Sequence, residues 1–362
     1  MATILFLTVD GGGNVPPALV IAHELQARGH DIRFLGAEAQ RAAITGQGFA
    51  FRAYRHGTDW SARVNRSFAG TVTAFAGLIA ARGPGFDLVD ALAEEPADVV
   101  VVDGMIPRTL GTAASLGVPA VALMHTFAEF FLARPIELFG RIRGFSPRAM
   151  WAAAPLTIVT TDDRLDPASA DSPSNYVWTG VAEPWPLAAA RPQQPPRVLV
   201  NLSTNFVPGQ ARHLQTILDA VATLPVRVTV TTGSSINPAS LRLGENCTAV
   251  VFADHAGLLP TASLVVGHGG HSTTMRALLH GVPLLVLPMS PIDQPMIGRA
   301  VARAGAGLAL PKDAPVGDIR SAVTTVLDDP GFARRAGEIA GRLREQDGPS
   351  VAADRILGLL GL

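Results

Sequence analysis

Cysteine is almost absent from this chain, because Cys247 is the only one in 362 residues. A single cysteine excludes an internal disulfide and any metal cluster that is built from several cysteines. We therefore interpret Cys247 as a small core residue and not as a nucleophile.

Charge and tyrosine are also scarce. Charged residues make up 16% of the chain, the formal net charge is −1, and two residues are tyrosine. No run of aromatic residues is interleaved with lysine and arginine. This composition gives no broad attraction to nucleic acid or to acidic membranes, so we expect neither partner.

Long hydrophobic runs are missing as well, although apolar residues reach 48%. No run approaches the roughly 18 residues of a membrane span, so none is expected. Residues 1–10 are too short, and lack the positive flank, for a signal peptide. We expect a well-buried globular protein of the cytoplasm, and a homodimer is compatible with the sequence.

What the chain does have is a regular alternation of short apolar runs and amphipathic stretches. This alternation predicts βαβ units with parallel sheets, and the length is too great for one ordinary core. The first half is predicted to contain strands at 3–8, 31–35, 98–102, 120–124 and 156–160, the last of this half, and helices at 17–28 and 108–116. The second half is predicted to contain strands at 198–202, 226–231, 249–252, 262–266 and 284–287, and helices at 211–223, 271–280, 316–327, 334–344 and 349–362.

A proline-rich segment separates the two halves and reads as a linker. The expected division is an N-terminal domain at 1–181, a linker at 182–196, a C-terminal domain at 197–345, and a last helix within 346–362 that packs back on the first domain. The predicted fold is α/β, with two doubly wound Rossmann-like domains that face each other across a cleft. Ligands of such sheets bind beyond the carboxyl ends of the strands.

The most informative motif is Val-Val-Gly-His-Gly-Gly-His-Ser-Thr-Thr at 265–274. It reads as a buried strand, a glycine-rich turn and a helix start, whose free N–H groups and dipole favour an anion. Glycines let the backbone approach that anion closely, and the side chains of His268, Ser272 and Thr273 can bond phosphate oxygens. Asp293 and Gln294 follow the next strand and suit sugar hydroxyls. The motif therefore predicts a site for a diphosphate that carries a sugar.

These residues and the two-domain plan resemble the bacterial natural-product glycosyltransferases of the GT-B fold, in family 1, which are related to the plant UDP-glycosyltransferases. The resemblance runs from Thr3 to about Glu345 and is strongest over 250–310. It implies an inverting, metal-independent hexosyltransferase without a cofactor. Its substrates would be a UDP- or TDP-sugar and a hydrophobic acceptor such as a polyketide or aromatic aglycone, as in antibiotic biosynthesis.

The resemblance also assigns residues to the donor. Phe252, which precedes the turn Leu258-Leu259-Pro260, would stack on the base, and the polar ends of two earlier strands would complete the site. The expected donor-binding residues are Ser203, Thr204, Gly233, Phe252, His268, Gly269, Gly270, Ser272, Thr273, Asp293 and Gln294.

The chain departs from the family where the general base is expected. The position of the family's N-terminal histidine holds Gly13, and Arg276 replaces the glutamate with which plant relatives hold the ribose. Three residues remain candidates for the base. They are Asp10, His125 at the end of the strand 120–124, and Asp103, which matches the aspartate that supports the family histidine.

The acceptor is expected to contact Gly13, Asn14, Trp60, Phe75 and Phe127, although aromatic residues at such spacing also suit a core. Two other functions remain open at this stage. One is a nucleotide-sugar epimerase, which would need no acceptor pocket. The other is a donor-binding helper protein that has lost the catalytic base.

Overall fold

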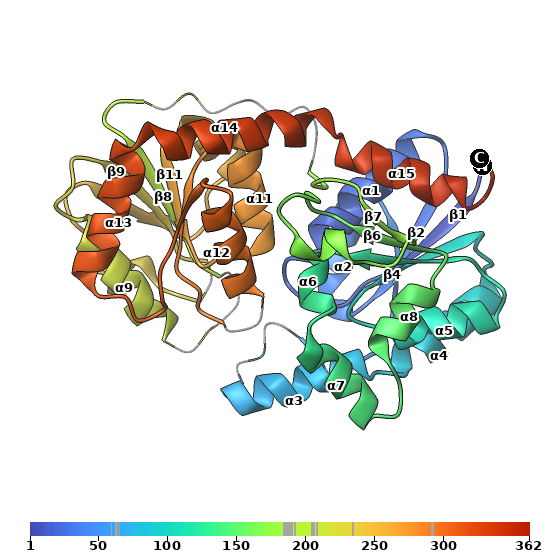
Figure 1. The fold of residues 1–362 in the computed structure, drawn as a ribbon. Coiled ribbons are helices and arrows are strands. Elements are labelled where there is room, and N and C mark those ends of the chain that lie inside the picture. Colours follow the sequence, from blue (N-terminus) through green and yellow to red (C-terminus); the bar gives the residue numbers. More distant parts are fainter. Residues whose placement is uncertain are drawn as a thin grey trace. The chain divides into compact units, whose positions relative to one another are not determined.

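The computed structural model describes residues 1–58, 60–61, 64, 66–183, 191, 193–203, 207, 209–233, 235–290 and 293–362. The chain divides into two compact units (Figure 1). The first consists of Met1–Pro184 together with Gln346–Leu362, and the second of Trp185–Glu345.

The first unit is built on a seven-stranded parallel sheet in the order β3-β2-β1-β4-β5-β6-β7. Its strands are β1 Thr3–Leu7, β2 Asp31–Gly36, β3 Ala50–Ala53, β4 Val99–Asp103, β5 Ala120–Met124, β6 Leu156–Val159 and β7 Tyr176–Trp178. Every residue of β4 and of β5 is buried. Helices on both faces of a parallel sheet explain why these strands are continuous apolar runs.

The helices of this unit include the C-terminal segment of the chain. They are α1 Val15–Ala27, α2 Arg41–Thr45, α3 Phe68–Ile79, α4 Gly83–Glu94, α5 Arg108–Ser115, α6 Ala128–Phe131, α7 Arg134–Ile142, α8 Pro147–Ala153 and α15 Gly348–Gly358. Helix α15 packs beside α1 (Figure 1). The guanidinium of Arg28 lies 2.5 Å from the carboxylate of Asp354 and donates to the hydroxyl of Ser350 at 2.7 Å.

The second unit is built on a six-stranded parallel sheet in the order β10-β9-β8-β11-β12-β13. Its strands are β8 Arg197–Asn201, β9 Arg227–Thr231, β10 Cys247–Val250, β11 Leu264–Gly267, β12 Leu284–Val286 and β13 Gly307–Ala309. Its helices are α9 Gln210–Val221, α10 His255–Leu258, α11 His271–His280, α12 Gln294–Arg303, α13 Val316–Asp328 and α14 Pro330–Glu345.

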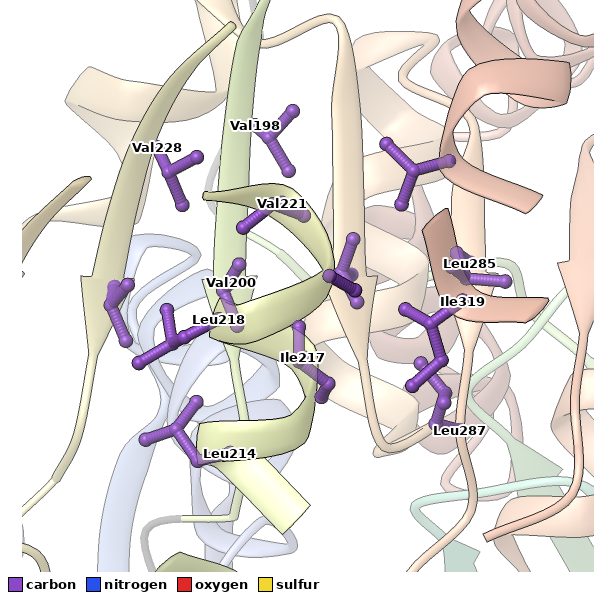
Figure 2. Close-up of a cluster of buried hydrophobic side chains, with 14 of the residues drawn as sticks. Val198, Val200, Leu214, Ile217, Leu218, Val221, Val228, Leu285, Leu287 and Ile319 are labelled. Carbon is purple, nitrogen blue, oxygen red and sulfur yellow. The ribbon is translucent and has the colours of Figure 1, made fainter. Parts of the chain in front are cut away.

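Helix α9 illustrates how the core of the second unit forms. Leu214, Ile217, Leu218 and Val221 recur at helical spacing and are all at most 1% exposed. Figure 2 shows them packed toward the strands, beside residues such as Val200 of β8. An apolar stripe of this kind predicts a helix that covers a sheet, and burial of the stripe stabilises both layers.

The predicted α/β fold with two parallel, doubly wound sheets is confirmed, but several short elements escape the sequence pattern. The strand 156–160 was expected to end the first half, whereas β7 follows it and pairs with it in parallel. Strands β7 and β13 have three residues each, which is too short for a periodic pattern. The sequence pattern also did not predict strand β3 or the helices α2, α3, α4, α6, α7, α8, α10 and α12.

One stretch of the described residues, Ala69–Glu94, has the length and apolarity of a membrane span, with a mean hydropathy of 1.2. The expectation that no apolar run approaches that length overlooked it. In the structure this stretch forms most of two helices of 12 residues each, α3 and α4, separated by residues 80–82. About 20 helical residues are needed to cross a bilayer, so neither helix is long enough alone.

Candidate functional site

The glycine-rich turn joins β11 to α11, where the motif places it. Gly269 has a φ of +82°, and a Cβ there would lie 2.8 Å from Cγ1 of Val286. A Cβ on Gly270 would lie 2.6 Å from Nε2 of His268. The first glycine is therefore required by backbone conformation and by space, and the second by the imidazole that packs against it at the start of the helix.

His268 is held as a neutral imidazole. Its Nδ1 is buried and has no hydrogen-bond partner in the described part of the chain. The pKa of His268 is lowered from 6.5 to about 4, mainly by burial; a hydrogen bond with the backbone of Asn201 opposes this change, and the nearby His213 contributes to it. At neutral pH the ring carries no charge, so it can offer an N–H to an anion without the cost of a buried positive charge.

Protonation of His268 should make the stability of the folded chain depend on pH. Because its pKa falls from 6.5 to about 4 on folding, the unfolded chain binds this proton more readily between these two values. The free energy of unfolding of the wild type should therefore fall by up to about 3 kcal/mol relative to that of His268→Gln as the pH falls through this window. Urea unfolding of both proteins at about pH 7 and about pH 4.5 measures this, and a pH-independent difference would contradict it.

A polar hub that the sequence reasoning missed lies at the carboxyl end of β8. The Asn201 amide donates to the Thr231 hydroxyl at 2.8 Å and lies 3.3 Å from Nε2 of His255. Its oxygen accepts from the hydroxyl of Thr273 at 3.4 Å. Burial, and then the charge of Arg276, lower the pKa of His255. The available signal was a polar residue that ends an otherwise apolar strand.

Other predicted donor residues lie at the carboxyl ends of the same sheet. The ring of Phe252 is 67% exposed just after β10, which leaves a face for stacking. Gly233 has a φ of +65° after β9, and its N–H donates to the carbonyl of Val251. Ser203 follows β8, and its carbonyl accepts from Gln210 at 2.5 Å. Thr204 lies outside the described residues.

The predicted sugar contacts differ in their surroundings. Gln294 begins α12 and is 8% exposed. Its Oε1 accepts from the backbone N–H groups of Met289 at 2.7 Å and Ser290 at 2.8 Å. This oxygen therefore holds the preceding loop and is not directed to a sugar hydroxyl. Asp293, at the N-cap of the same helix, is partly exposed.

In the first unit, the three candidate bases follow neighbouring strands, with Asp10 after β1, Asp103 at the end of β4 and His125 after β5. Oδ1 of Asp103 lies 3.8 Å from Nδ1 of His125. Asp103 is 5% exposed, and its oxygens accept from the N–H of Met105 at 2.9 Å and the amide of Asn14 at 2.6 Å. Burial raises the pKa of Asp103, and these three neighbours oppose that rise.

Asn14 is part of this framework and does not face an acceptor as predicted. It is 2% exposed. Its amide nitrogen donates to the carbonyl of Val9 at 2.8 Å and to Asp103, while its oxygen accepts from the N–H of Gly11 at 3.1 Å. The side chain therefore ties the loop after β1 to the end of β4. The structure does not leave it free for a ligand.

Asp10 and Gly13 occupy the same loop in different environments. Asp10 is 5% exposed, and its Oδ2 accepts from the hydroxyl of Ser61 at 2.6 Å. Gly13 is exposed, and a Cβ built on it would meet no atom within 4 Å. A side chain at the position of the family histidine would therefore fit, but this chain has none.

A row of aromatic rings crosses the same unit. Trp60 meets Phe75 edge-on at 5.8 Å, Phe75 lies 5.9 Å from Phe130, and Phe130 lies 5.1 Å from Phe131. Phe131 meets His125 at 5.8 Å with an interplanar angle of 90°. Trp60 is partly exposed, whereas Phe75 is buried.

Phe127 belongs to the core of the first unit. It is 1% exposed and stands at the N-terminus of α6. The predicted acceptor contact of this ring is therefore not available in this conformation. Its aromatic spacing has the simpler explanation of a core residue.

Within the described ranges, no group of three or more His, Cys, Asp or Glu side chains is placed to hold a metal ion. Asp162 is buried and Asp163 is its neighbour in the chain. Burial is the main cause of the raised pKa of Asp163, and Asp162 adds to it.

Comparison with known proteins shows what this chain is similar to. Residues 215–359 match the C-terminal domain described as erythromycin biosynthesis protein CIII-like. The chain is 26% identical to 4'-demethylrebeccamycin synthase of Lentzea aerocolonigenes, over 99% of this chain and 100% of that protein.

Solved structures share the fold over the whole chain. The calicheamicin glycosyltransferase CalG4 superposes with a TM-score of 0.80 at 22% identity and covers 100% of this chain and 98% of its own. The glycosyltransferase VinC, solved in complex with dTDP, gives a TM-score of 0.77 at 20% identity and covers 99% of both chains. The two-sheet fold is therefore that of solved GT-B glycosyltransferases, and the C-terminal match and the full-length relative show that the chain is similar to proteins of bacterial natural-product biosynthesis.

Proposed function

We propose that the chain transfers a sugar from a uridine or thymidine diphosphate sugar to a hydrophobic small molecule, such as a polyketide or aromatic aglycone, with inversion at the anomeric carbon. The observation that carries this proposal is the turn from β11 to α11, where His268 packs against Gly270 at the start of a helix. The complex of VinC with dTDP supports a nucleoside diphosphate as the donor part.

The donor end of the reaction would use the start of α11. Its free backbone N–H groups and its dipole favour the diphosphate, and the hydroxyls of Ser272 and Thr273 stand in its first turn. The neutral His268 would donate one N–H to the same anion. Negative charge develops on the diphosphate as it leaves, so these donors stabilise the transition state without a metal ion.

We assign the general base to His125, with Asp103 as its positioning residue. Both oxygens of Asp103 accept hydrogen bonds from the chain, and Nδ1 of His125 is buried near it without a hydrogen-bond partner among the described residues. A proton on Nδ1 directed at Asp103 leaves the lone pair of Nε2 for the acceptor. The 3.8 Å separation exceeds a hydrogen bond, and such contacts often shorten when substrate binds.

The chemistry of this assignment is a single displacement. Nε2 of His125 takes the proton of an acceptor hydroxyl while its oxygen forms a bond to the anomeric carbon. The bond between that carbon and the phosphate oxygen breaks, and the diphosphate leaves with the electron pair. Asp10 remains the second candidate for the base, because its carboxylate is also at the carboxyl edge of this sheet.

A thermal-shift panel tests the donor proposal. UDP or TDP at about 100 times its Kd should stabilise the wild type by about 3 kcal/mol, and GDP and NAD should not. His268→Ala should lose most of that shift, because the substitution removes a hydrogen-bond donor to the diphosphate. The matched control is His23→Ala, which alters an exposed histidine in the first unit. A shift with NAD alone, or an unchanged shift in His268→Ala, would overturn the proposal.

A further inference from the structure

The segment from His125 to Glu129 carries an unusual concentration of unpaired polar atoms. His125 Nδ1, Thr126 Oγ1 and Glu129 Oε2 are each buried without a hydrogen-bond partner among the residues that the structure describes. Thr126 is 3% exposed. Folded proteins pair nearly all such atoms, so three in five consecutive residues require an explanation. Trp60 Nε1 is a fourth atom of this kind.

Loose packing does not explain these unpaired atoms, because the backbone of the segment is firmly held. The carboxylate of Asp166 accepts from the N–H of Ala128 at 2.6 Å and from the N–H of Glu129 at 3.2 Å. The same carboxylate accepts from Nε1 of Trp178 at 3.0 Å. Phe131, two residues after Glu129, is fully buried. Hydrogen bonds therefore hold the backbone at the start of α6 in place.

The residue that follows this segment belongs to the aromatic row. Phe130 follows Glu129 and contacts Phe75, which in turn contacts the partly exposed Trp60. Binding sites for small organic molecules combine such apolar walls with a few polar groups that fix orientation. Within this segment, His125 is already explained by the proposed proton transfer, whereas Glu129 and Thr126 have no assigned role.

We propose that Glu129, with Thr126, is a recognition site for a second hydrogen-bond donor on the acceptor. The inference rests on the proposed function and extends it. The carboxylate of Glu129 would accept from an ammonium or hydroxyl group of a flat aromatic acceptor, at a position other than the hydroxyl that is attacked. An ionised carboxylate only accepts hydrogen bonds, so it selects ligands that donate. Charge makes the ammonium the stronger partner.

Three naphthalene probes test this inference by direct binding, measured through their own fluorescence. The probes are 2-naphthol, 2,7-dihydroxynaphthalene and 7-aminomethyl-2-naphthol. The wild type should bind the aminomethyl compound at least about 10-fold more tightly than 2-naphthol, with the dihydroxy compound between them. Glu129→Gln should remove most of the preference for the ammonium and keep part of that for the hydroxyl. Glu129→Ala should remove both, and binding of 2-naphthol should not change.

Stability and turnover complete the design. Because Glu129 Oε2 has no partner to lose, both variants should keep the unfolding midpoint of the wild type or exceed it. Glu245→Gln, at an exposed position of the second unit, is the matched control and should bind all three probes like the wild type. Equal binding of the probes by the wild type, no binding of any probe, or a clear loss of stability would overturn the inference. Failure of sugar transfer to 2-naphthol by a wild type that still binds the probes selectively would count against the proposed function alone.

Discussion

Replacing His125 with alanine is expected to lower kcat by about 100- to 10,000-fold, the usual contribution of a general base. The side chain is 14% exposed, and its Nδ1 lies 3.8 Å from the buried carboxylate of Asp103. Without the imidazole, the proton acceptor that we propose is missing when the acceptor oxygen attacks. The nucleotide sugar should bind as before, because the donor residues belong to the second unit. Single-turnover rates together with the donor thermal shift measure both effects.

Two companion measurements separate this role from a structural one. Added imidazole should restore part of the rate of His125→Ala, because a free imidazole molecule can act as the base in the space that the side chain leaves. If Asp10→Asn abolishes transfer while His125→Ala retains most of it, Asp10 is the base and the assignment to His125 is wrong.

The same rate measurements on Asp103→Asn test whether Asp103 positions the imidazole of His125. Asp103 accepts hydrogen bonds from Met105 and Asn14 through its two oxygens. An asparagine has one accepting oxygen and one donating NH2 group, so it cannot accept both hydrogen bonds and also attract the Nδ1 proton of His125. The rate should fall, and added imidazole should not restore it. An Asp103→Asn variant with the full rate would remove Asp103 from the mechanism.

Replacing Gly270 with valine is expected to weaken the binding of UDP or TDP by about 10- to 100-fold, the value of one or two hydrogen bonds to a charged group. Gly270 has φ −65° and ψ 132°, which any residue can adopt, so the effect would not come from backbone strain. It would come from space, because the new Cβ would stand 2.6 Å from Nε2 of His268. The imidazole would have to leave its place at the helix start.

A matched glycine in the same unit controls for stability. Gly341 lies inside α14, and a Cβ on it would meet no atom within 4 Å. Gly341→Ala should therefore bind the nucleotide like the wild type and be more stable by about 0.5–1 kcal/mol, since alanine favours a helix. Calorimetric titration gives the Kd of each variant. Wild-type affinity in Gly270→Val would show that His268 can shift without loss, and it would end the assignment of this turn as the diphosphate site.

The sequence by itself determined the features that depend on local spacing. Short apolar runs and amphipathic stretches predict most strands of both sheets, because burial on two faces needs continuous apolar residues. They predict fewer than half of the described helices, those whose apolar stripe is clear. The predicted helix at 271–280 has the same first and last residues as α11. Glycines and hydroxyl residues mark its start, and Gly281 marks its end. These signals lie within a few residues of one another, so no knowledge of the fold is needed to see them.

Side-chain partners across the sheets could not be predicted in this way. Asn14 and Asp103 are 89 residues apart in the chain, yet their amide and carboxylate meet at 2.6 Å because β1 and β4 are neighbours in the sheet. The sequence predicts Asn14 as an acceptor contact, whereas in the structure its amide holds Asp103. Likewise, only the tertiary structure shows that the oxygen of Gln294 holds a loop and that Asn201 joins Thr231 to His255.

The same distinction explains what decided the assignment of the base. Composition and motif left Asp10, Asp103 and His125, which all lie at strand ends, as candidates for the base. The strand order placed His125 beside Asp103, and the burial of Asp103 among its donors is what supports our proposal that it positions the imidazole. Sequence patterns record which face of an element is buried, whereas the pairing of distant polar side chains depends on strand order and on the exclusion of water, which only the folded chain creates.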